Sequence, residues 1–359
     1  MKRTWLKWMP ALTVPVVIAA VAVAMPVAAN AAVNLPTKTP AQVLALAAGE
    51  KITALSGTLS QTSNLGLPEI PITGTDASAG SALELLTGSH TARIFVDGST
   101  KQRVQVLDTM AERDLVRNGS EVWLYDSKKK TAAHSTLATG SATPSLTEGS
   151  IPTPDQLASK FLSSVDTTTT VSLGADLRVA GRTAYNLVLT PKAGETLIGS
   201  VSIAVDSETG LPLSVDVFAR SQEAPAFRVG FSTLDLGAPA ASLFDFTPPA
   251  GVTVTEKSPS AETPRADQSQ TENSQADGSQ TDTAKPTVAG TGWDAIVALP
   301  AGKSTARATS SPLFGKLTTS VTGGRLFRTS LINVLLTDDG RVFAGSVPVA
   351  TLQAAAATK

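Results

Sequence analysis

Alternation between apolar and polar residues is the feature that most limits how this chain can fold. Apolar residues recur at every second position in a series of short segments between residues 90 and 231. Asp97-Gly98 and Asn118-Gly119 separate segments of this series, and both dipeptides are typical of tight hairpin turns. Period-two segments joined by such turns predict an antiparallel meander in which each strand buries one face.

Two helices are expected among these strands. Thr39 can cap the first helix, which begins at Pro40, and Thr153 can cap the second, which begins at Pro154. The second helix carries apolar residues at positions 157, 161, 162 and 165. The apolar residues that roughly follow helical spacing in the first helix are Val43, Leu44, Leu46, Ala47, Ile52 and Leu55, and a strand is expected to start at Gly57.

The predicted number of strands is too large for a single flat sheet. The order is helix, about five strands, helix, and then about five or six more strands, and so many strands have to curl or close. The sequence therefore predicts an α+β fold: an antiparallel sheet of about 10–11 strands that curls or closes, accompanied by two helices.

The N-terminus is organised like a secretory signal peptide. Residues 2–7 carry three positive charges, residues 11–25 are apolar, and Ala29-Asn30-Ala31 matches a cleavage signature. Residues 1–31 are therefore predicted to be removed before Ala32. An uncleaved membrane anchor is the alternative, because no charged residue occurs between Trp8 and Thr37. In both cases the rest of the chain is expected outside the cytoplasm.

A polar segment divides the remainder of the chain. Residues 255–289 are rich in Ser, Gln, Thr, Asp, Glu and Pro and contain no aromatic residue, Leu or Ile, which predicts a disordered linker. The linker separates a large module, 32–254, from a small β-rich C-terminal segment, 290–359. This segment is marginal for a core of its own, so we expect it to pack against the large module or a partner.

Composition narrows the function. The formal net charge of -1 lacks the basic footprint of a nucleic-acid binder. The absence of cysteine excludes disulfides, thiol nucleophiles and cysteine metal sites. Only His90 and His134 are available as imidazoles, and no nucleophile elbow, P-loop or dinucleotide motif accompanies them. We therefore expect no enzyme activity, no metal, no cofactor and no nucleic-acid partner.

For three short motifs, a structural interpretation is stronger than a functional one. Residues 118–120 form a glycosylation sequon, but a type I′ turn explains them. Residues 337–341 contain paired carboxylates that suggest cation binding, yet they suit a tight turn between apolar strands. The lysines at 128–130 suggest contact with anionic headgroups, and a solvated hairpin tip is the alternative.

Three stretches carry a resemblance to a known superfamily. The first is the opening helix that runs into Gly57-Thr58-Leu59. The second, residues 179–191, reads VAGRTAYNLVLTP, and the third, residues 203–213, reads IAVDSETGLPL. Together they resemble the bacterial lipoprotein-carrier superfamily, which includes the LolA carriers and the N-terminal domain of the RseB/MucB sigma-factor regulators. The chain departs from the carriers in its length, its linker and its additional tail.

The resemblance implies that the sheet is a strongly curved, half-open antiparallel half-barrel. Helices would cover its concave face like a lid, and the cavity between them would hold acyl chains. Two short helices with small residues cannot fill a wide concave surface, so an apolar cavity is expected; an ordinary filled core is the alternative. The candidate lining residues are Ile94, Val96, Val104, Val106, Val122, Leu124, Leu187, Leu189, Ile203 and Val215.

These observations favour a non-enzymatic, extracytoplasmic protein of the bacterial cell envelope that binds a lipid or an acylated protein. The alternative implied by the resemblance is a regulator, similar to RseB/MucB, that binds a membrane anti-sigma factor. The ligand, the partner and the direction of any transfer are not encoded in a recognisable motif.

Overall fold

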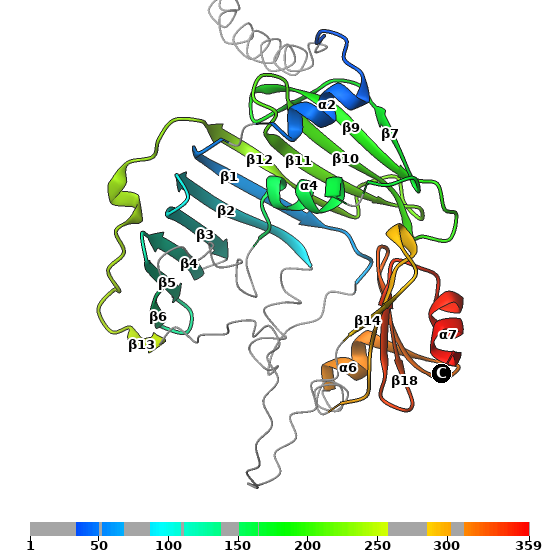
Figure 1. Cartoon of the computed structure of the whole chain (residues 1–359). Helices are drawn as coiled ribbons and strands as arrows, with labels where there is room; N and C mark the ends of the chain where they lie inside the picture. Colours follow the sequence, from blue (N-terminus) through cyan, green and yellow to red (C-terminus); the bar gives the residue numbers. More distant parts are fainter. Residues whose placement is uncertain are drawn as a thin grey trace, which may run out of the picture.

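Two antiparallel-rich sheets with a few helices make up the protein in a computed structural model (Figure 1). The structure describes residues 34–49, 52–67, 87–108, 111–137, 151–163, 165–257, 286–302 and 312–358. The predicted signal segment lies outside these residues. No helix within the described ranges is long and apolar enough to cross a membrane.

The large sheet has thirteen strands and is open, because its path begins at one edge strand and ends at another. Its first half contains β1 (Ala54–Ser63), β2 (Gly88–Asp97), β3 (Lys101–Asp108), β4 (Ala111–Asn118), β5 (Glu121–Asp126) and β6 (Thr131–Thr136). Its second half contains β7 (Thr169–Leu173), β8 (Leu177–Val179), β9 (Arg182–Pro191), β10 (Ile198–Asp206), β11 (Pro212–Ala219) and β12 (Phe227–Asp235). The two halves join where β1 pairs with β12.

The last strand of the large sheet differs from the prediction. β13 (Thr253–Lys257) pairs with β6, and it is the one parallel pair among the described pairs of this sheet. The sheet is therefore mixed and larger than expected. Residues 255–257 of β13 and the whole of β14 (Thr287–Ala289) lie inside the segment predicted as a linker. Backbone pairing rather than burial holds these two strands.

Both predicted helix caps are present. In α2 (Pro40–Ala47), the Thr39 hydroxyl accepts from the Gln42 amide and the Gln42 side chain accepts from the Thr39 amide, which is a capping box. In α4 (Pro154–Ser163), Thr153 and Gln156 make the same reciprocal bonds. The first helix ends earlier than its apolar spacing suggested, and Leu55 belongs to β1.

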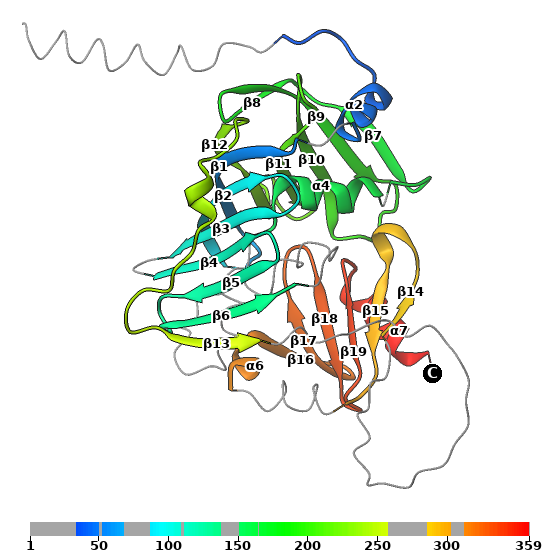
Figure 2. The same ribbon diagram turned by 60° about the vertical axis from the view of Figure 1, so that its left-hand side comes forward.

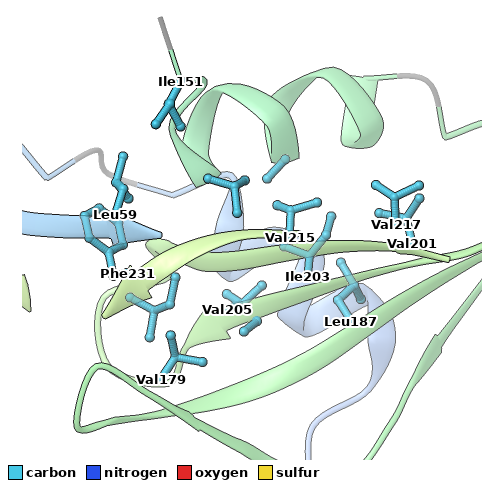
Figure 3. Close-up of a cluster of buried hydrophobic side chains, with 14 of the residues drawn as sticks. Leu59, Ile151, Val179, Leu187, Val201, Ile203, Val205, Val215, Val217 and Phe231 are labelled. Carbon is cyan, nitrogen blue, oxygen red and sulfur yellow. The ribbon is translucent and has the colours of Figure 1, made fainter. Parts of the chain in front are cut away.

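The helices cover only part of the sheet. α2 contacts β7, β9 and β10, whereas α4 contacts β11 and β12, and neither has comparable contacts with β3–β6. The described helices therefore do not form a lid over the whole concave face. Beneath α4, Ile203, Val215 and Val217 point toward the helix from neighbouring strands (Figure 3). Ile203 and Val215 are fully buried there.

The C-terminal segment forms a second, six-stranded sheet. Its other elements are β15 (Ile296–Leu299), α6 (Pro312–Leu317), β16 (Thr318–Val321), β17 (Gly324–Arg328), β18 (Asn333–Thr337), β19 (Val342–Gly345) and α7 (Val349–Ala357). α7 packs on β18 and β19, and Leu352 joins a small core with Leu335 and Phe343. The turn predicted at residues 337–341 connects β18 and β19.

This small domain packs against the large module, as its marginal size suggested. The Leu197 amide donates to the Ser346 carbonyl over 2.6 Å, and the Ser330 amide donates to the Leu65 carbonyl over 3.0 Å. Leu331 is buried in the core of the large module. The contact between the domains therefore combines backbone hydrogen bonds with apolar burial.

Candidate functional site

A pocket of about 190 Å³ lies where the two halves of the large sheet meet the ends of α2 and α4. Its floor is formed by apolar side chains of three strands. These side chains are Leu55 on β1, Ile94 and Val96 on β2, and Phe231 on β12. β1 pairs with both neighbours, and Leu55 lies opposite Val96, so the pairing register brings these side chains to one face.

Two helix ends and one turn form the walls of the pocket. The C-terminal part of α2 contributes Leu46 and Ala47, and the N-terminal part of α4 contributes Asp155 and Gln156. The third wall is the turn at residues 210–212 between β10 and β11. The pocket is thus assembled from segments that are far apart in the sequence.

Gly210 permits the close approach of this turn to α2. Its φ is +77°, a conformation that residues with a side chain rarely adopt. A Cβ atom at this position would clash with the carbonyl oxygen of Leu46. Gly210 therefore allows Leu211 and Pro212 to close the pocket against the end of α2.

A buried ion pair supports the same turn. Asp206 accepts hydrogen bonds from the Thr209 amide (2.9 Å) and the Thr209 hydroxyl (2.6 Å), and Arg182 donates two further bonds. Burial raises the pKa of Asp206, but the bonds from Arg182 and Thr209 outweigh that effect and hold the pKa below its ordinary value. The carboxylate stays ionised and stabilises the conformation of the turn.

The rim of the pocket is polar and lacks a cation. Gln102, Thr153, Asp155 and Gln156 contribute polar atoms, and no lysine or arginine is among the described lining residues. Such a site does not select for an anionic headgroup by direct charge pairing. Its chemistry suits an apolar chain that enters past polar hydrogen-bonding groups.

The predicted lining residues divide into three groups. Ile94 and Val96 line the pocket. The pairing register places the other predicted residues on the same face, through pairs such as Ile203 with Val215 and Val104 with Ile94. Six of them are packed within the core itself, namely Val104, Val106, Leu187, Leu189, Ile203 and Val215. Val122 is buried and Leu124 half-buried on β5, away from the described pocket.

Several pocket residues were missed by sequence reasoning. Leu46, Ile52, Leu55 and Phe231 were assigned to elements, but nothing in their spacing showed that they would meet. Leu211 and Pro212 were quoted in the resemblance motif as part of a hairpin. The only available signal was the Thr209-Gly210 dipeptide, which indicates a turn but not what the turn contacts.

The two histidines have hydrogen-bonding partners away from the pocket. His90 lies 2.9 Å from the carbonyl oxygen of Thr87 through Nε2. His134 lies on β6 between the carboxylates of Glu121 and Glu256. The expectation of a non-catalytic protein remains a prediction that activity measurements have to test.

A comparison with protein-family models tests the resemblance seen in the sequence. Residues 84–249 match the family model of the MucB/RseB N-terminal domain. The resemblance to this domain is confirmed. The MucB/RseB-like segment extends from the residues before β2 to the 3-10 helix η2 (Ala241–Phe244) and its flank, and contains both of the longer motif stretches.

Solved structures give a more distant likeness. MucB in the Pseudomonas aeruginosa MucA/MucB complex is 20% identical, covering 88% of this chain and 95% of that chain with a TM-score of 0.41. A LolA superfamily protein from Nitrosomonas europaea is 10% identical, covering 58% and 99% with a TM-score of 0.23. No curated protein matches the chain. Likeness at this level leaves the function to be argued from the chain's own residues.

Proposed function

We propose that this chain is a non-enzymatic protein of the bacterial cell envelope that binds one acyl chain of a lipid or an acylated protein in the pocket between α2, α4 and the sheet. The observation that carries the proposal is the apolar floor of Leu55, Ile94, Val96 and Phe231 beneath a polar rim. A concave apolar surface with a few polar groups at its mouth is the usual form of a site for an apolar ligand.

The size of the pocket limits what it accepts. A cavity of about 150 Å³ lined by aliphatic and aromatic residues holds benzene. The pocket of about 190 Å³ is therefore suited to the end of one chain rather than to a whole lipid. Burial of about six methylene groups would contribute about 5 kcal/mol before the cost of ordering the chain.

Filling the pocket tests this proposal. Val96 lines the pocket and is half-buried, so Val96→Trp adds a ring that occupies the space of the ligand. The variant is expected to lose at least about tenfold in affinity for a fluorescent fatty acid or phospholipid, because a filled apolar site offers no buried area to the chain. Unchanged affinity in a folded Val96→Trp protein would contradict the proposal.

A matched substitution controls for the added tryptophan. Val297 is 39% exposed on β15 of the small domain, outside the pocket. Val297→Trp introduces the same ring without touching the lining residues, and its affinity for the same probes is expected to equal that of the unmodified protein. An equal loss of probe affinity in both variants would point to a general effect of the added ring.

The family match favours a second candidate function. MucB of Pseudomonas aeruginosa is found in a complex with MucA. By that analogy, the chain would regulate a membrane anti-sigma factor, and the pocket would sense lipid rather than transport it. Mixing the protein with the extracytoplasmic part of an anti-sigma factor from the same organism, with and without lipid, tests this candidate. Lipid-dependent binding supports regulation, and no binding in either condition favours a carrier.

A further inference from the structure

The edge strand β13 is held to the sheet in an unusual way. Its residues 253–256 are exposed, and the strand pairs with β6 through its backbone. Figure 2 shows it beside β6 at the edge of the large sheet. It precedes the segment between the two domains. With little side-chain burial, a single polar contact can decide how firmly this strand is held.

That contact is a histidine placed between two carboxylates. His134 on β6 lies opposite Glu256 on β13 and opposite Trp123 on β5. Its Nδ1 is 2.8 Å from Glu256 and its Nε2 is 2.5 Å from Glu121. The contact with Glu256 is the one side-chain hydrogen bond of β13 among the described residues.

The imidazole cannot easily turn away from these partners. Its ring stacks on Trp123 with a centroid separation of 4.2 Å and an interplanar angle of 19°. Trp123 in turn contacts Phe246, which belongs to the segment that leads from β12 to β13. The ring is therefore fixed in a plane that aims one nitrogen at each carboxylate.

Protonation then controls both contacts together. A protonated imidazole donates from both nitrogens, whereas a neutral one has a single N–H and must turn a lone pair toward one carboxylate. The charged groups that face His134 are Glu121 from β5 and Glu256 from β13. Asp245 of the covering segment is bonded to Asn118 instead.

We propose that His134 is a pH-sensitive latch that holds the edge strand β13 on β6 when the imidazole is protonated and loosens it when the imidazole is neutral. Loosening uncovers the hydrogen-bonding edge of β6.

The shift in the pKa of His134 supports tighter binding of β13 at low pH. Burial lowers the pKa of His134, but hydrogen bonds to Glu256 and Glu121 outweigh burial and raise the pKa above its ordinary value of 6.5. A raised pKa in the folded state means that the stabilisation is fully present below pH 6.5 and is lost as the pH rises through the higher, folded-state value.

Hydrogen exchange of the full-length protein tests the latch. We expect the protection of β13 amides, corrected for intrinsic exchange, to be about two- to fivefold higher at pH 5.5 than at pH 8.5, which is the range of an exposed ion pair. The Thr253 amide, which donates to the Lys130 carbonyl over 2.9 Å, is a suitable reporter. Equal protection at the two pH values would overturn the proposal.

Two variants and one spectrum make the test specific. His134→Phe retains a ring for Trp123 but no charge, so its β13 protection is expected to be low at both pH values. Glu256→Gln is expected to lower the titration midpoint of His134 in a histidine NMR spectrum, where the only other imidazole is His90. An unchanged midpoint in Glu256→Gln, or a retained pH response in His134→Phe, would contradict the latch.

Discussion

Arg182 binds Asp206 through two parallel hydrogen bonds, with Nε 2.7 Å from Oδ1 and Nη2 2.9 Å from Oδ2. Each residue comes from one of the two longer motif stretches that carried the sequence resemblance. The motifs therefore meet in space, and their contact supports the turn that forms one wall of the pocket. A feature recognised first as a sequence pattern is thus a structural support for the candidate site.

Removal of this arginine is expected to be costly. Arg182→Ala leaves the Asp206 side chain, which is 1% exposed, without its charged partner. We expect the free energy of unfolding at pH 7 to fall by about 3 kcal/mol, as measured by urea denaturation. Glu208 binds the same arginine but is 76% exposed, so Glu208→Gln is expected to cost less than about 1 kcal/mol. Equal losses in both variants would contradict this account.

Gly210 provides a separate test of the pocket wall. Gly210→Ala introduces a Cβ that clashes with Leu46 and forces a side chain into a left-handed conformation. The turn or the end of α2 has to move, so we expect a stability loss of about 1–3 kcal/mol together with weaker lipid binding. Gly181 has a similar φ, +80°, but open space around it. Gly181→Ala should therefore destabilise the protein without altering lipid affinity beyond that effect.

Asp114 is expected to make stability depend on pH. Burial raises its pKa to about 6, although Arg103 at 2.5 Å opposes this shift. The folded state then binds a proton between about pH 4 and 6 that the unfolded state has lost, so the free energy of unfolding falls as the pH rises through that window. The decrease from this group is expected to reach up to about 3 kcal/mol.

Urea denaturation at pH 4.5 and 7 checks this prediction. Asp114→Asn is expected to show a smaller decrease than the unmodified protein. Burial also raises the pKa of Asp216. Asp216→Asn therefore serves as a comparison and should remove a separate part of the decrease in unfolding free energy between pH 4.5 and 7. An Asp114→Asn protein with the full decrease would show that Asp114 is not its source.

Trp293 is expected to anchor the small domain. Its indole donates to the Thr169 hydroxyl over 2.9 Å, and its ring lies 6.0 Å from that of Phe161 on α4. Trp293→Ala removes both contacts, so the Leu197 amide, which binds Ser346 across the interface, should exchange about tenfold faster with deuterium. Trp293→Phe keeps the ring contact and should show an intermediate rate. Unchanged exchange in Trp293→Ala would place the anchor elsewhere.

Local signals in the sequence predicted much of the fold. The caps at Thr39 and Thr153, the hairpin turns and the alternation of the strands are short-range features, and each appears where expected. β13 was not predicted, because its sequence TVTEK is polar and its parallel pairing with β6 brings together residues that lie far apart in the chain. Leu55 was placed in a helix because one apolar residue fits either period.

The pocket could be predicted only in part, because contacts between residues far apart in the chain leave no local signal in the sequence. Ile94 and Val96 followed from the alternation of one strand, and both line it. Leu46, Leu211 and Phe231 come from a helix end, a turn and a distant strand, and their meeting depends on how α2 docks. No spacing within the sequence encodes that docking. The remaining predicted residues share the face of the sheet, and six of them are enclosed by packing in the core.

Native mass spectrometry of the protein purified from its own cell envelope tests the central claim most directly. The account predicts that the unmodified protein carries one adduct with the mass of a lipid, and that Val96→Trp, purified in the same way, carries none. A protein that shows only its polypeptide mass, and that binds no fatty acid, phospholipid or acylated peptide after delipidation, would contradict the proposal of an acyl-chain site.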